Sequence, residues 1–169
     1  MSTIISYTGN TFATDFKVAI VASEFNLQIV DKLLLDAKKT LLAQQIGTIT
    51  IVRVPGAFEL PYAARQVAPE HDVVIALGAV IRGETPHFDF VSQACIEGLN
   101  RVIHDTNTPV VLGVLTTDTY KQAQARANGT AHDDHIENHQ PQGSGVNAAI
   151  VALRMASLAR QLHEGKLPQ

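Results

Sequence analysis

The sequence has one cysteine, few charged residues and no long apolar run, and each shortage narrows the class of protein. Cys95 alone cannot form an internal disulfide, which agrees with a reducing compartment, and its place on an apolar helix face predicts a buried structural thiol. A formal net charge of −3 provides no basic surface for nucleic acid. The longest apolar runs have the length of strands, so we expect no membrane span, no signal peptide and a cytoplasmic location.

Common cofactor motifs are also missing. No G-x-G-x-x-G follows the first predicted strand, which argues against a dinucleotide, and no P-loop is present. The first three strand-to-helix turns contain no lysine, so a Schiff base to the enzyme has no obvious donor. If a carbonyl is attacked here, the amine has to come from a substrate. We therefore expect small-molecule substrates and no cofactor.

Strand-like and helix-like segments alternate along the chain. Hydrophobic residues make up 46% and charged residues 17%, so we expect one globular domain over residues 1–169 with an extended arm at residues 1–15. Predicted strands cover residues 17–22, 48–54, 71–77 and 110–115, and predicted helices cover residues 27–46, 62–67, 86–102, 120–127 and 146–162. The alternation predicts an α/β fold with a four-stranded parallel sheet between two helical layers. Residues 4–7 could add a strand to a sheet edge, in this subunit or a neighbouring one.

Residues 80–91, V-I-R-G-E-T-P-H-F-D-F-V, join the third predicted strand to a helix. Thr85 is a favourable N-cap, and Pro86 suits the first helical position. Gly83 to His87 should then form a turn at the carboxyl end of a strand, where open α/β sheets bind ligands. Free N–H groups there favour an anion such as phosphate, and the His87 imidazole can exchange protons near neutral pH. The alternative is a well-capped helix with a surface histidine.

The other strand-to-helix turns should lie beside this one, since right-handed crossovers bring all of them to one edge of the sheet. They contribute an exposed aromatic at Phe25, a carboxylate at Glu59 and hydroxyls at residues 116–119. Each has a simpler interpretation: Phe25 as a packing residue, Glu59 as a favourable charge near a helix N-terminus, and residues 116–119 as a helix cap. Arg126 could likewise be a solvated helix residue. Their combination favours a binding site.

Histidines are concentrated in one polar segment, residues 128–143. His132, His135 and His139 lie there among carboxylates, a composition that resembles a metal site. Nothing in the sequence fixes this loop tightly enough to bring the ring nitrogens together. A hydrated surface loop is the preferred interpretation, and we expect no metal.

These motifs together resemble the lumazine synthase (6,7-dimethyl-8-ribityllumazine synthase) family. The matching segments run in the family's order and spacing over nearly the whole chain up to residue 127. They are Phe25-Asn26, V-P-G-A-F-E-L-P at residues 54–61, A-L-G-A-V-I-R-G-E-T-P-H-F-D-F-V at residues 76–91, G-V-L-T-T-D-T at residues 113–119, and Arg126. The resemblance implies a three-layer αβα sandwich of the flavodoxin-like type and a place in riboflavin biosynthesis.

By this resemblance the chain condenses 5-amino-6-(D-ribitylamino)uracil with 3,4-dihydroxy-2-butanone 4-phosphate, and His87 is the proton shuttle. Phe25 stacks on the pyrimidinedione ring, and Glu59 accepts hydrogen bonds from ribityl hydroxyls. Arg126 reaches the phosphate from the neighbouring subunit. The other implied contacts are Ala57 and Phe58 at the ribityl chain, Ala79, Val80 and Ile81 at the pyrimidine edge, and Glu84 and Thr85 at the phosphate.

The sequence departs from the family pattern in several places. Ser144 is the nearest match to a lysine that usually precedes the last helix, so one cation near the phosphate is missing. Leu112 stands where an aromatic often lies against the pyrimidine, and Glu84 brings a carboxylate near the phosphate, so we expect its backbone N–H to face the ligand. Residues 132–139 lengthen a connection on which shell packing depends. We therefore expect a homopentamer or a pair of pentamers, and not a closed icosahedral shell.

Two rival functions stay open from the sequence. One is a non-catalytic flavin- or lumazine-binding assembly on the same scaffold, and the other is a flavodoxin-like electron carrier. The presence of His87, Glu59 and Arg126 favours the enzyme, since a binding protein needs no proton shuttle. An electron carrier would keep a bound flavin through purification.

Overall fold

The computed structural model describes residues 4–11, 15–130 and 143–164. Its centre is a four-stranded parallel sheet in the order β2-β1-β3-β4. The strands are β1 (Lys17–Ser23), β2 (Thr48–Val54), β3 (Val73–Ile81) and β4 (Val110–Thr117). This architecture confirms the predicted α/β fold of the flavodoxin-like type.

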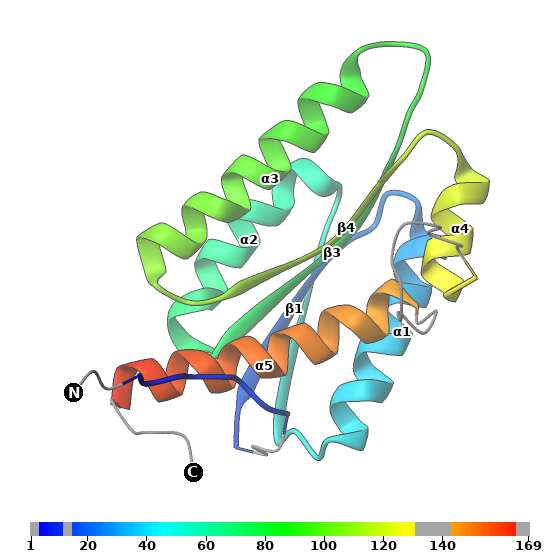
Figure 1. Cartoon of the computed structure of the whole chain (residues 1–169). Coiled ribbons are helices and arrows are strands. Elements are labelled where there is room, and N and C mark those ends of the chain that lie inside the picture. The colour runs from blue at the N-terminus through cyan, green and yellow to red at the C-terminus, as the bar shows by residue number, and fades with distance from the viewer. Residues whose placement is uncertain (1–3, 12–14, 131–142, 165–169) are drawn as a thin grey trace.

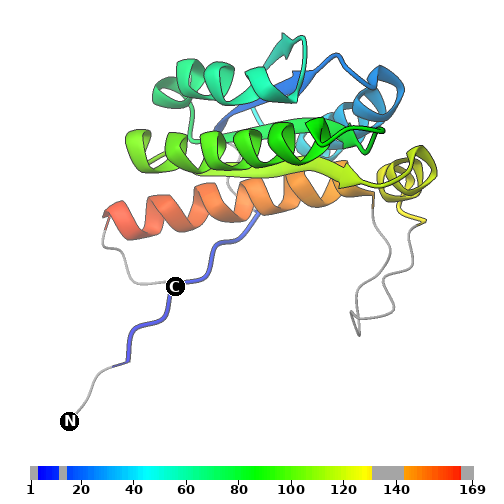
Figure 2. The same ribbon diagram turned by 90° about the horizontal axis from the view of Figure 1, so that it is seen from above.

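Helices cover both faces of the sheet, and Figures 1 and 2 show the resulting layers. One layer contains α1 (Leu27–Ala43), α4 (Tyr120–Asn128) and α5 (Ser144–Glu164), and the other contains α2 (Leu60–Val67) and α3 (His87–Thr106). Short 3₁₀ turns, η1 (Ala57–Glu59) and η2 (Ala68–Glu70), flank α2. Among the described residues, no helix is both long and apolar enough to cross a membrane.

The two inner strands, β1 and β3, are buried on both faces because each lies between two other strands and two helical layers. Ile20 and Ile75 point into the core beneath α1 and α5. Ala19 and Val74, their neighbours in sequence, point into the core beneath α2 and α3. Nearly continuous apolar runs are what a parallel sheet with two covered faces requires. Because the inner strands are fixed in the core, the turns at their carboxyl ends are held in place.

Two glycines allow close approach between helices. A Cβ added at Gly145 would lie 2.2 Å from the Leu33 carbonyl oxygen, so α5 can cross α1 closely only without a side chain there. A Cβ added at Gly98 would lie 2.6 Å from Pro61 Cγ, at the contact between α3 and α2. Both layers are thus packed tightly enough to fix the helix ends near the sheet edge.

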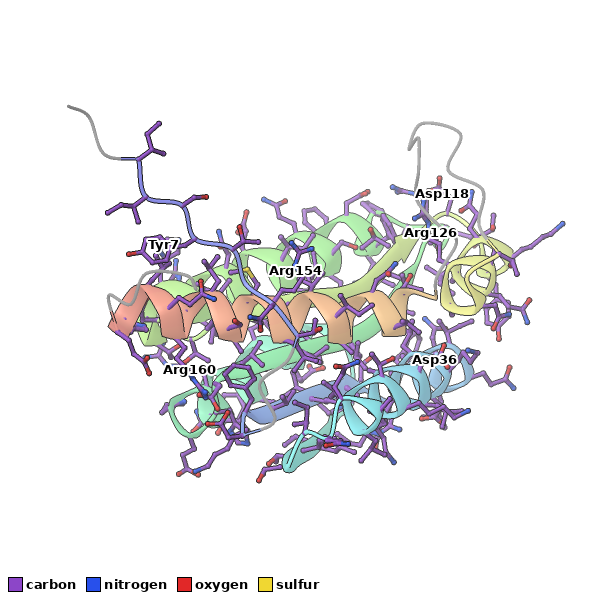
Figure 3. All side chains as sticks on the ribbon, turned by 60° about the horizontal axis from the view of Figure 1, so that its bottom comes forward. Tyr7, Asp36, Asp118, Arg126, Arg154 and Arg160 are labelled. Carbon is purple, nitrogen blue, oxygen red and sulfur yellow. The ribbon has the colours of Figure 1, made fainter. Side chains whose placement is uncertain are left out.

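The N-terminal residues follow α5 and do not join the sheet. The Asn10 N–H donates to Ser157 Oγ at 3.2 Å, and a Cβ at Gly9 would meet the Arg154 carbonyl oxygen. Figure 3 shows this segment beside α5, with Arg154 labelled. Residues 4–7 form no strand within this chain, and Ile4 is 93% exposed. Pairing of this segment with a neighbouring subunit stays a prediction, and residues 1–3 and 12–14 of the expected arm lie outside the described residues.

Several element boundaries differ from the sequence prediction by two to four residues, including the ends of α1, β3 and α3. The first helix ends at Ala43 and not near Ile46, because Gln45 takes a left-handed conformation (φ 58°) and the Ile46 N–H turns back to the Leu41 carbonyl oxygen at 3.2 Å. The third strand continues to Ile81 and does not stop at Leu77. This longer strand carries its last residues to the edge where the site lies.

Candidate functional site

The carboxyl ends of β1, β2 and β3 enclose a cleft of about 680 Å³. Most of the residues that the sequence singled out for substrate contact line it, namely Phe25, Ala57, Phe58, Glu59, Ala79, Val80, Ile81, Thr85 and His87. Phe88, Phe90 and Val91 line it as well. The sequence analysis included these three residues in the long motif but assigned none of them a substrate contact. Helical spacing from His87 could have found Phe90 and Val91, which lie three and four positions further along α3 and so share its face.

Phe25 reaches the cleft because its turn is fixed on two sides. Its backbone N–H donates to the Pro55 carbonyl oxygen at 3.0 Å. Asn26 next to it is left-handed (φ 58°), a conformation that asparagine tolerates well, and its side-chain amide donates to the Ala79 carbonyl oxygen at 2.8 Å. An asparagine before a helix usually caps it with its side chain, but the Asn26 amide bonds β3 instead and makes no capping bond. The Phe25 ring is left 71% exposed at the cleft.

Glu59 enters the cleft from η1, the 3₁₀ turn after β2. Ala57 in this turn is buried and anchors it, whereas Phe58 is exposed. The Glu59 carboxylate folds back over Gly56, where an added Cβ would lie 3.0 Å from Glu59 Oε2. The glycine thus leaves room for a carboxylate that can accept hydrogen bonds from hydroxyl groups in the cleft.

The turn between β3 and α3 has backbone donors without partners. Among the described residues, the N–H groups of Gly83, Glu84, Thr85 and His87 have no hydrogen-bond acceptor. The prediction that Thr85 is the N-cap is wrong: Pro86 occupies the cap, and the helix begins at His87. Pro86 can do so because its ring already fixes φ near the helical value, −66° here. Thr85 makes no capping bond and lines the cleft instead.

His87 lies at the first position of α3 with an exposed side chain. No described residue forms a hydrogen bond with its imidazole. The ring therefore faces the cleft with both nitrogens open to solvent or to a ligand. Such a group can accept a proton from one bound atom and give it to another.

Four residues discussed from the sequence lie outside this cleft. Glu84 belongs to the turn but does not line the cleft. Leu112 and Ser144 line a separate depression of about 490 Å³ between β4 and α5. Arg126 lies in the last turn of α4, where its carbonyl oxygen accepts a hydrogen bond from Ser144 Oγ at 3.1 Å. Figure 3 labels Arg126 close to Asp118, at the α4 end of the molecule. One chain alone thus does not bring Leu112 and Arg126 into the cleft.

Two further predictions concern cysteine and histidine. Cys95 lies on the buried face of α3, in the core between α2, α3 and the sheet, as predicted, and burial raises the pKa of its thiol to about 11. A thiol with that pKa is a poor nucleophile at neutral pH. His132, His135 and His139 lie outside the described residues. Within the described ranges, no group of three histidine, cysteine or acidic side chains is arranged to hold a metal ion.

Residues 15–160 match the family model for 6,7-dimethyl-8-ribityllumazine synthase. The chain belongs to this family. It is 43% identical over 150 residues to the 6,7-dimethyl-8-ribityllumazine synthase of Mycobacterium ulcerans strain Agy99, a match that covers 89% of each chain. It is 47% identical over 146 residues to the enzyme of the same name from Mycolicibacterium vanbaalenii, covering 86% of this chain and 88% of the relative. The lumazine synthase match includes the three turns that form the cleft.

Proposed function

We propose that this chain condenses 5-amino-6-(D-ribitylamino)uracil with 3,4-dihydroxy-2-butanone 4-phosphate, giving 6,7-dimethyl-8-ribityllumazine, phosphate and water. The observation that carries the proposal is the cleft itself. It combines an open aromatic face at Phe25, a carboxylate at Glu59 and an imidazole at His87 beside a turn with unpaired N–H groups. The chain's membership of the lumazine synthase family supports the same reaction.

The pyrimidine substrate would bind between the turns that follow β1 and β2. Phe25 offers an exposed ring for stacking on the pyrimidinedione, and the backbone at Ala79 to Ile81 can meet the edge of that ring. Glu59 can accept hydrogen bonds from ribityl hydroxyls near Ala57 and Phe58. In this arrangement the aromatic Phe25 meets the apolar face of the ring, and the acidic Glu59 meets the hydroxyl groups of the ribityl chain.

The phosphate substrate would bind at the turn between β3 and α3. The unpaired N–H groups of Gly83, Glu84 and Thr85 and the N-terminal dipole of α3 favour a dianion there. Arg126 of an adjacent subunit would add a guanidinium, which binds phosphate through charge-assisted and often bidentate hydrogen bonds. Ser144 supplies no second cation, so Arg126 carries more of the charge.

The chemistry needs no lysine of the protein, because the pyrimidine substrate supplies the amine. Its 5-amino group attacks the ketone and, with loss of one water, forms an imine between the substrates. Phosphate is then eliminated, leaving an enol that becomes a ketone. The ribitylamino nitrogen attacks this ketone, and loss of a second water closes the ring. The protein contributes mainly by holding two reactants together in one orientation. His87 moves protons among the amine, the hydroxyl and the leaving group.

We infer that the working form is a homopentamer: the family resemblance implies five subunits, and two different surfaces that expose apolar side chains support a closed ring. Phe58, Tyr62 and Phe90 are exposed around the cleft, whereas Leu112, Val151 and Met155 are exposed along β4 and α5. Contacts between two unlike surfaces form closed rings when the rotation closes. The loop at residues 132–139 lies outside the described residues, and its charges support separate rings or paired rings over a shell. Hollow spheres in electron micrographs at neutral pH would argue against separate rings.

The reaction is tested directly by incubating the purified protein with both substrates and following the fluorescence of the lumazine product. Omission of either substrate is the control. A protein that binds lumazine tightly but forms none would instead fit the alternative, a non-catalytic flavin- or lumazine-binding assembly. An absorbance spectrum of the purified protein tests the electron-carrier alternative, since that protein would retain flavin.

A further inference from the structure

Arg82 joins three elements at the edge of the sheet through one side chain. Its Nε donates to Asp118 Oδ1 at 2.9 Å, in the turn after β4. Its two terminal nitrogens donate to both carboxylate oxygens of Asp89, in the first turn of α3, at 3.0 and 3.1 Å. The guanidinium carbon lies 4.2 Å from the centre of the Phe88 ring, and the Arg82 backbone N–H donates to the Thr117 carbonyl oxygen at 2.9 Å.

This arrangement fixes both ends of the turn at residues 83–86. The turn itself has no backbone hydrogen bond of its own among the described residues before Pro86. Its first end is held by the backbone bond from Arg82 to β4, and its second end is held by the side-chain bonds from Arg82 to Asp89. A guanidinium suits this task because its planar fork meets a carboxylate with two parallel bonds. The hydrogen bonds that Arg82 donates to Asp89, and then the one to Asp118, raise the pKa of Arg82 above its ordinary value.

We infer that Arg82 is a positioning residue for the phosphate substrate: it fixes the turn whose free N–H groups bind the phosphate, without contacting the phosphate itself. The inference rests on the proposed function and deepens it. The sequence gives Arg82 no role of its own, although it lies within the long matching motif. Its effect is transmitted through the backbone of residues 83–85 and through Phe88, which lines the cleft.

The competing explanation is that Arg82 binds the phosphate directly and replaces the cation missing at Ser144. Two observations oppose it. Arg82 does not line the cleft, although Gly83 next to it does. Its Nε and both terminal nitrogens already donate to carboxylates, and its face lies over Phe88. The two explanations predict opposite results when a carboxylate partner is neutralised.

The test measures KM for each substrate and kcat in the variants Arg82→Ala, Arg82→Lys and Asp118→Asn. Loss of the fixed turn should raise the KM for the phosphate substrate about tenfold in Arg82→Ala, with a smaller rise of about threefold in Asp118→Asn. The KM for the pyrimidine substrate and kcat should stay within about twofold in both. Arg82→Lys should recover little, because an ammonium cannot form the parallel bonds to Asp89.

A matched control is Arg65→Ala, which removes another exposed pair between arginine and a carboxylate on α3, Arg65 with Asp105. This pair joins α2 to α3 away from the cleft, and its loss should leave both KM values unchanged. In the double variant Arg82→Ala/Asp118→Asn, the KM should match that of Arg82→Ala alone, since both changes break the same bond.

Three results would overturn the inference. One is a lower phosphate-substrate KM in Asp118→Asn, which a directly binding guanidinium freed from its carboxylate would give. Another is full recovery by Arg82→Lys, and the third is an equal change for both substrates. If the wild-type protein forms no lumazine, calorimetric titration with inorganic phosphate replaces the kinetic arms. Weaker phosphate binding in Arg82→Ala and Asp118→Asn, but not in Arg65→Ala, would then support the positioning role of Arg82 although the proposed reaction fails. Unchanged phosphate binding in all three variants would refute the positioning role as well as the reaction.

Discussion

The cleft at the ends of β1, β2 and β3 and the depression between β4 and α5 differ in chemistry. The cleft contains an aromatic ring, a carboxylate and an imidazole beside unpaired backbone donors. The depression is lined mainly by aliphatic side chains such as Leu112 and Met155, with Ser144 at one end. The first region can bind and convert small molecules, whereas the second has the composition of a contact surface. In the proposed ring, one copy of the chain would supply the cleft and the next copy would cover it with the surface beside Arg126.

The sharpest test of this division is Arg126→Ala. We expect the KM for the phosphate substrate to rise about 10²-fold, because a charge-assisted contact to phosphate is lost. The KM for the pyrimidine substrate should change far less. Steady-state kinetics with each substrate varied in turn measures the split, and Lys121→Ala, a cation on the same helix, is the control. Equal losses for both substrates would contradict a phosphate-specific role.

Within the cleft, His87→Ala should lower kcat about tenfold and leave both KM values nearly unchanged. The loss is expected to fall below the roughly 10²–10⁴-fold usual for general acid–base catalysis, because the substrates supply the amine and the leaving group. The pH dependence of kcat should flatten in the same variant. His104→Ala changes an exposed histidine at the far end of α3 and should behave as wild type. A wild-type pH profile in His87→Ala would refute proton transfer by this residue.

Mixing these two impaired variants tests whether the regions belong to one shared site. His87→Ala and Arg126→Ala chains, unfolded and refolded together, should regain about a quarter of wild-type sites, because a random ring pairs an intact cleft with an intact Arg126 at that frequency. Refolding each variant alone is the control. No gain over the separate variants would mean that both residues act within the same subunit or not together.

The sequence predicted the layers and the turns well, because period-2 and period-3.6 patterns separated by glycine and proline are local signals. It ended β3 too early, since Gly78 within the apolar run resembles a stop. In the structure the missing side chain at Gly78 leaves room for Leu60 Cδ1, which an added Cβ would approach to 3.2 Å. The strand can therefore continue beneath α2.

The contacts that hold the cleft in shape were not predictable from the sequence. An asparagine at the start of a helix is typical of a local cap, yet the Asn26 amide bonds Ala79, which is distant in sequence. Arg82 had no assigned role, and its partners Asp89 and Asp118 come from two other elements. Local patterns cannot specify such pairs, because they depend on which strands become neighbours. The residues that line the site were therefore easier to predict than the contacts that hold them in position.

Burial of Cys95 makes its reaction with a thiol reagent a measure of how often the α2 and α3 layer separates from the sheet. The chain has one cysteine, so a thiol reagent has one possible target. That thiol lies on the buried face of α3, between this helix, α2 and the sheet. Labelling should proceed only when this layer separates from the sheet, and its rate then measures that opening. The raised pKa adds a pH dependence: in the unfolded chain the thiol loses its proton near its ordinary value of 9.0, whereas the native thiol keeps it up to about 11. Between these values the unfolded state binds fewer protons, so the free energy of unfolding should fall as the pH rises. A Cys95→Ala variant should lose both the labelling and this part of the fall in unfolding free energy at alkaline pH. The wild-type thiol can therefore report the rate of opening without an engineered label.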